Sequence, residues 1–121
     1  MKKPKNYSGF AWNKHLKKKK RKKYQKFYKK HGFDPTETWN LDITIADFVI
    51  PRLKYFRQNL NGHPGDITFK QWKKYLDQMI EGFENATYED IDMNDGEPVK
   101  DTDKMKKGLD LFSSYYNHLW D

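Results

Sequence analysis

Apolar residues in this chain recur at steps of three and four, and no segment of useful length alternates apolar and polar residues with a period of two. Steps of three and four place side chains on one face of an α-helix, whereas a half-buried strand requires period-two alternation. The pattern therefore predicts an all-α fold: a small helical bundle of three core helices plus a basic N-terminal helical arm.

The segment 68–83 carries the clearest helix signal. Thr68 and Gln71 have the spacing of a capping box, and Ile67 and Trp72 have that of a hydrophobic staple. We expect Gly82 to weaken the end of this helix, because glycine is a poor helix former. The expected buried stripe consists of Phe69, Trp72, Leu76, Met79, Ile80 and Phe83.

A second helix is predicted from Asp34 toward Asn61. Asp34 fits the N-cap, Pro35 the first helical position and Glu37 the capping box. Pro51 lacks a backbone donor, so a kink or break is expected there. The apolar face is wide enough for a central helix that more than one neighbour contacts. It comprises Trp39, Leu41, Ile43, Ile45, Ala46, Phe48, Val49, Ile50, Leu53, Phe56 and Leu60.

The last helix is predicted over 103–119, with Asp101 or Thr102 as its cap. Its expected stripe consists of Met105, Leu109, Phe112, Tyr116 and Leu119. A tryptophan close to the last residue suggests a docked terminus, and Trp39, Trp72 and Trp120 are expected to pack between helices.

Charge divides the chain sharply at Gly32. Residues 1–31 hold 14 of the 24 Lys and Arg residues and no acid, which leaves 10 cations against 17 acids in the remainder. We therefore predict a basic N-terminal arm over 1–31, helical from about residue 14 to 30. A helical domain is predicted over 32–121, with an acidic loop at about 85–100.

The basic arm carries the strongest functional signal, because its cations are interleaved with aromatic side chains. Such a segment can contact phosphates and stack on bases. The predicted polyanion-binding residues are Lys17, Lys18, Lys19, Lys20, Arg21, Lys22 and Lys23. The predicted stacking or interface residues are Trp12, Tyr24, Phe27, Tyr28 and His63. Two other interpretations stay open: a solvated tail, or neutralisation of the arm by the acidic loop.

Several chemistries are excluded or disfavoured. The chain has no cysteine, which excludes disulfides, iron–sulfur clusters and thiol nucleophiles. Its four histidines lack metal-ligand spacing, and no nucleophile motif or glycine-rich phosphate loop accompanies its carboxylates. We expect no catalytic residue, no metal, no cofactor and no enzymatic activity. His63, in a turn over 61–66, could line a small pocket.

No apolar run reaches the roughly 20 residues that span a bilayer, and the first residues lack the apolar stretch of a signal peptide. The sequence therefore predicts no membrane partner and a cytoplasmic location.

Four segments together resemble one family. Residues 34–54 read DPTETWNLDITIADFVIPRLK, and they are followed by NGHPG at 61–65, by Trp72 with LDQMIEGF at 76–83, and by GLDLF with a closing LW at 108–120. This pattern resembles a group of small tailed-phage proteins described as hypothetical, over roughly residues 30–83 and 104–121. The resemblance implies an accessory protein in the cytoplasm of a bacterial host, and it implies no site residues.

Two functional hypotheses follow. The first is a small non-enzymatic phage accessory protein that acts by binding, host-directed or anti-defence, and either occludes a host bacterial protein or captures a nucleotide ligand. The second is a nucleic-acid-binding module that uses the Lys-rich arm.

Overall fold

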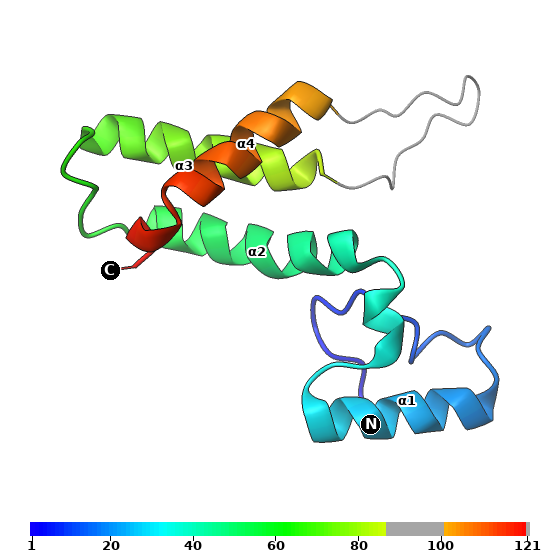
Figure 1. Cartoon of the computed structure of the whole chain (residues 1–121). Helices are drawn as coiled ribbons and strands as arrows, with labels where there is room; N and C mark the ends of the chain where they lie inside the picture. Colours follow the sequence, from blue (N-terminus) through cyan, green and yellow to red (C-terminus); the bar gives the residue numbers. More distant parts are fainter. Residues whose placement is uncertain (87–100, 121) are drawn as a thin grey trace. The chain divides into compact units, whose positions relative to one another are not determined.

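The computed structural model describes residues 1–86 and 101–120, and within them it contains helices and no strand, which confirms the all-α prediction (Figure 1). The elements are α1 (Lys18–His31), the 3-10 helix η1 (Pro35–Thr38), α2 (Leu41–Gln58), α3 (Phe69–Glu84), α4 (Thr102–Ser114) and the 3-10 helix η2 (Tyr116–His118). Most of the predicted acidic loop, residues 87–100, lies outside the described part.

The chain forms two compact units, Met1–Phe48 and Val49–Asp121. The boundary lies within α2, whereas the change in charge lies at Gly32. The basic segment therefore shares a compact unit with η1 and the start of α2.

Helix α1 ends where the sequence predicts and begins four residues later than predicted. Gly32 takes a left-handed φ of 80°, and its N–H donates to Tyr28 O at 2.7 Å. The predicted start near Lys14 is wrong, because Asn13 organises a turn there: its side chain accepts from His15 N and its carbonyl from Leu16 N. The cations that follow also oppose the positive end of the helix dipole.

The predicted single helix from Asp34 to Asn61 is divided in two. The capping box of Asp34 and Glu37 is present, but it begins η1, and α2 begins only at Leu41. Helix α2 then continues through Pro51, so the helix does not break there, and the alternative of a kink stays a prediction. Its buried face is narrower than expected, since Ala46 and Leu53 are buried whereas the other apolar positions of the predicted face are half-buried or exposed. The exposed ones are Trp39, Leu41, Ile45 and Phe48.

Helix α3 supplies most of the core of the second unit. Both hydrogen bonds of the Thr68–Gln71 capping box are present. The predicted stripe is confirmed except for Phe69, which is partly exposed beneath the ammonium of Lys73. Its buried members are Trp72, Leu76, Met79, Ile80 and Phe83.

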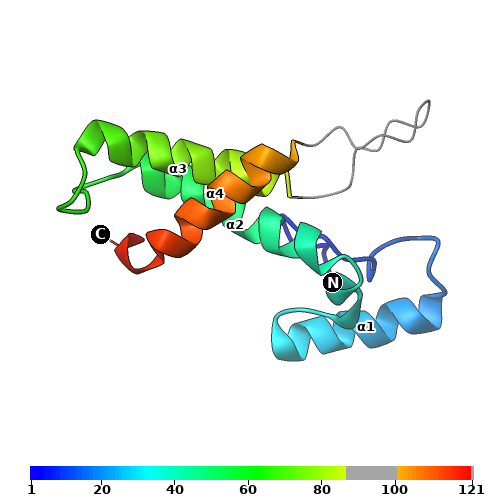
Figure 2. The same ribbon diagram turned by 45° about the horizontal axis from the view of Figure 1, so that its top comes forward.

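Helices α3 and α4 lie side by side in both views (Figures 1 and 2), and glycines allow their close approach. A Cβ on Gly82 would lie 2.6 Å from Gly108 Cα, and a Cβ on Gly108 would lie 2.4 Å from Gln78 O. Gly82 therefore has a packing role that the sequence did not indicate. Helix α3 continues past Gly82 to Glu84, and the expected weakening of its end stays a prediction.

The C-terminal segment differs most from the prediction. Asp101 caps α4 as expected, but the α-helix ends at Ser114 and the chain tightens into η2. Tyr116 and Trp120 are consequently 62% and 74% exposed, so the predicted docking of the last tryptophan is wrong. Of the three tryptophans predicted to pack between helices, Trp72 is buried and Trp39 is 54% exposed.

Replacing Gly82 with alanine tests the close approach of α3 and α4. Alanine normally stabilises a helix relative to glycine by about 1 kcal/mol. Here we expect Gly82→Ala to destabilise the protein by about 1–3 kcal/mol, since the added methyl group meets backbone atoms. Urea unfolding measures the change, and Gly65→Ala, where no atom lies within 4 Å of the added Cβ, serves as the control. Equal stability of the two variants would contradict the packing role.

Candidate functional site

The first unit is organised around the buried carboxylate of Asp34. Asp34 and Thr36 are 0% and 1% exposed. The Asp34 carboxylate accepts from the Tyr7 hydroxyl, from Thr36 N at 2.8 Å and from Thr36 Oγ1 at 2.5 Å. The oxygens of a buried carboxylate need such donors, because burial removes their hydrogen bonds to water. These bonds fix the segment around Tyr7 to η1.

The same contacts shift two pKa values. Burial, and then the hydrogen bond to Asp34, raise the pKa of Tyr7, so its phenol stays protonated and continues to donate. Burial also raises the pKa of Glu37, whose carboxylate accepts from Asp34 N at 2.8 Å. The network therefore keeps the Tyr7 phenol neutral, so that it donates to the Asp34 carboxylate.

Aromatic rings attach α1 to this network. Tyr7, Trp12 and Tyr28 contact one another edge to face, with centroid distances of 5.0, 5.9 and 5.5 Å. Gln25 on α1 donates to Ala11 O at 2.9 Å, and Ala11 is fully buried. Helix α1 is therefore packed against the segment that precedes it.

The aromatic residues predicted to stack on bases in this unit all make ring contacts within it. Trp12 and Tyr28 belong to the cluster with Tyr7. Tyr24 contacts Trp39 at 6.3 Å, and Phe27 contacts His31 at 4.2 Å. Their packing role is established, and stacking on bases stays a prediction.

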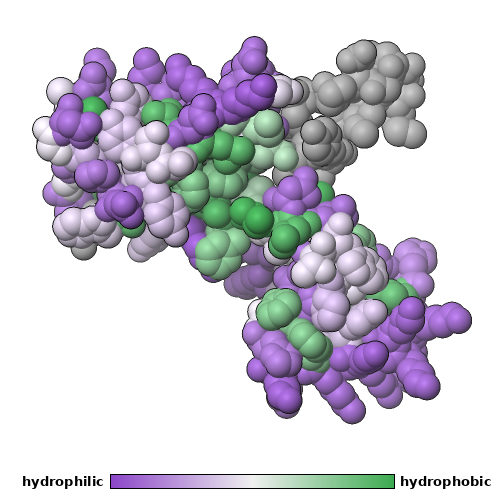
Figure 3. Space-filling view, viewed as in Figure 1, coloured by the Kyte–Doolittle hydropathy of each residue, from purple (hydrophilic) through white to green (hydrophobic). Residues whose placement is uncertain are grey.

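Seven lysines share the exposed side of α1. Lys18, Lys22 and Lys26 follow one another at steps of four, and Lys19 and Lys23 form the adjacent row. All are exposed, and Figure 3 shows hydrophilic side chains over this helix. We call these residues the lysine face: Lys18, Lys19, Lys22, Lys23, Lys26, Lys29 and Lys30.

The predicted polyanion-binding residues, 17–23, and the residues of the lysine face overlap only in part. Lys17 is the N-cap, and Lys20 and Arg21 lie on the helix side of Tyr24 and Tyr28. Arg21 is half-buried, and its Nε has no hydrogen-bond partner among residues 1–86 and 101–120.

The prediction missed Lys26, Lys29 and Lys30, although their helical spacing from Lys22 and Lys23 was readable in the sequence. A hollow of about 220 Å³ lies beside Lys22, Lys26 and Lys29, and Met1 and Gln25 complete its lining.

No acid neutralises the lysine face within the described residues. The ion pairs found there are Lys54–Glu84 at 3.8 Å and Arg57–Asp77 at 2.6 Å, both outside the basic segment. The alternative prediction, that the acidic loop neutralises the basic arm, concerns residues 87–100, which lie outside the described part of the chain. The lysine face is thus an ordered cationic surface that can bind a polyanion.

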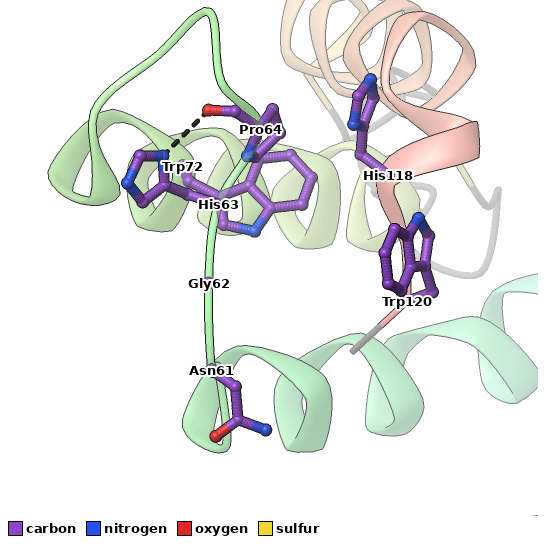
Figure 4. Close-up of a pocket in the computed structure, with 7 residues that line it drawn as sticks. All are labelled: Asn61, Gly62, His63, Pro64, Trp72, His118 and Trp120. Atoms are coloured by element: carbon purple, nitrogen blue, oxygen red, sulfur yellow. Dashed lines mark hydrogen bonds between the residues drawn. The ribbon is translucent and has the colours of Figure 1, made fainter.

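The second unit contains a pocket of about 280 Å³, and His63 is one of the residues that line it (Figure 4). The turn after α2, the start of α3 and the C-terminal segment form its walls. Its lining residues are Asn61, Gly62, His63, Pro64, Trp72, His118 and Trp120. No sequence pattern predicts that Trp72, His118 or Trp120 lines this pocket, because these residues come together only through the packing of distant segments.

Residues 1–86 and 101–120 contain neither a metal-site cluster nor a helix that could span a membrane. Within this part, no three histidine or carboxylate side chains converge on a possible metal site. No described helix combines the length and apolarity required to cross a membrane.

No protein-family model, curated protein or solved structure matches this chain. The resemblance to small tailed-phage proteins therefore stays a prediction.

Replacing Tyr7 with phenylalanine tests the network that holds α1. The change removes the donor to Asp34 and the acceptor for Ala11 N, so we expect a loss of about 1–3 kcal/mol and of helix content by circular dichroism. The control is Tyr55→Phe, at a 69% exposed position. If both variants unfold like the original protein, the network does not hold α1.

The same network predicts a pH dependence. The folded-state pKa of Tyr7 lies above its ordinary value of 10.0, so its contribution is fully present below that pH and is lost as pH rises beyond it. Urea unfolding on either side of pH 10.0 should show a larger loss of stability for the original protein than for Tyr7→Phe. Parallel losses would contradict the assignment.

Proposed function

We propose that this chain is a non-enzymatic binding protein whose lysine face contacts the phosphate backbone of nucleic acid. One observation carries the proposal: seven lysines occupy one side of an ordered helix, and no acid within the described residues pairs with them. Neutralisation of phosphates by lysines releases condensed counterions, which drives binding without sequence recognition.

The arrangement of the face adds to this argument. Lys18 and Lys29 lie eleven residues apart, so the row spans about 16 Å of a rigid helix. Because α1 is already packed in the first unit, binding does not require the helix to form, and less conformational entropy is lost. An unfolded lysine tail would lose that entropy on binding.

The resemblance to small tailed-phage proteins supplies the context of this proposal. In that context the chain acts in the cytoplasm of an infected bacterium, as an accessory protein directed at the host or its defences.

A second candidate function is the binding of a host bacterial protein. Leu41 and Ile45, one turn apart on α2, are 51% and 46% exposed. Exposed apolar side chains at this spacing are typical of helix surfaces that contact partner proteins. On this reading the lysine face steers an acidic partner toward the chain.

Removal of three lysines beside the hollow tests the proposed function. We expect the variant Lys22→Gln, Lys26→Gln, Lys29→Gln to bind a labelled DNA duplex more weakly, with a slope of log K against log salt reduced by about 2.7. Fluorescence anisotropy at several salt concentrations measures this slope.

The matched control is the variant Lys104→Gln, Lys106→Gln, Lys107→Gln on α4, which removes the same charge from exposed positions of the second unit. If both triple variants lose affinity equally, net charge rather than the lysine face determines binding. If the original protein binds no duplex or single strand at low salt, the proposal is wrong and the protein-binding candidate replaces it.

A further inference from the structure

The pocket of the second unit has the size and lining of a small-ligand site. Its volume of about 280 Å³ is close to the lower end of the range for such pockets, which suits a single ring system with a small substituent. Two tryptophans and two histidines line it, and its described lining contains no carboxylate and no lysine. This lining suits a neutral aromatic group better than a phosphate.

Trp72 supplies a hydrogen-bond donor to this pocket. The residue is 1% exposed and lines the pocket, and its indole N–H can only donate. Indole N–H groups of tryptophans that are largely buried usually pair with an acceptor. In Figure 4 the indole nitrogen lies on the ring edge turned toward the open space beside Gly62. A hydrogen-bond acceptor on a ligand in the pocket would pair with the indole N–H of Trp72.

Trp120 supplies an aromatic surface on the other side. Its side chain is 74% exposed, which is unusual for tryptophan, yet its Nε1 donates to Asn117 O at 3.0 Å. The hydrogen bond holds the orientation of the ring while much of its surface stays accessible. A ring held in this way can stack on a planar ligand at little cost in conformational entropy.

We propose that this pocket binds a nucleobase: a planar aromatic heterocycle that stacks on Trp120 and accepts a hydrogen bond from Trp72 Nε1. The base comes either from a free nucleoside or nucleotide or from a single strand. This inference does not rest on the lysine face, which belongs to the other compact unit.

The indole N–H signals of the four tryptophans test the proposal in the full-length protein by ¹⁵N–¹H NMR. Titration with uridine should move the signals of Trp72 and Trp120 and leave those of Trp12 and Trp39 in place. Trp12 is a suitable internal control, because its Nε1 already donates to Met1 O. Equal movement of all four signals, or no movement at millimolar uridine, would overturn the proposal.

A second ligand separates stacking from hydrogen bonding. Titration with 5,6-dihydrouridine, which retains the carbonyl acceptors and loses the aromatic ring, should produce much weaker binding. Equal affinity for the two nucleosides would contradict stacking on Trp120.

Variants at two exposed aromatic positions complete the test. Trp120→Ala should weaken uridine binding about 5- to 150-fold, the range for loss of one stacked base. The matched control is Tyr116→Ala, which removes a 62% exposed ring from η2 that does not line the pocket. Equal losses in both variants would overturn the assignment.

The source of the base is identified by comparing uridine with an oligouridylate of eight nucleotides. If the pocket binds the base, the affinity for both ligands should fall in the variant Trp120→Ala. Tighter binding of the oligonucleotide that persists in the Lys22, Lys26, Lys29 variant identifies a strand bound by the second unit alone. Equal affinities identify a free nucleoside or nucleotide.

Discussion

The hydrogen bonds to the buried carboxylate of Asp34 are the constraint on which the first unit depends. Asp34 caps η1 and at the same time accepts from Tyr7, 27 residues earlier in the chain. Tyr7 in turn supports the ring cluster with Trp12 and Tyr28. A single acid thus connects the N-terminal segment, η1 and α1 through side chains that are expensive to leave unpaired.

This support matters because α1 is a poor helix on its own. Its first turn contains only cations, which oppose the helix dipole, and its lysines repel one another at the i, i+4 spacing. Packing of its aromatic side must offset these costs. The result is a high density of positive charge on an ordered surface, and the proposed contact with phosphates would use this surface.

The sequence predicted local features better than tertiary ones. The capping boxes at Asp34 and Thr68 and the glycine end of α1 depend on neighbouring residues, and all three are confirmed. The aromatic pocket and the exposure of Trp120 depend on how distant segments pack, which no helical period encodes. The lysine face was partly predictable, since Lys26, Lys29 and Lys30 continue the spacing of the earlier run.

The central claim is that an ordered face, and not the number of lysines, determines nucleic-acid binding. The most direct measurement is the affinity of the variant Asp34→Ala for a labelled duplex, as a function of salt. This variant retains every lysine and arginine and is one unit more positive, so charge alone predicts equal or tighter binding. The account predicts weaker binding, because α1 loses its support. Affinity equal to or greater than that of the original protein would contradict it.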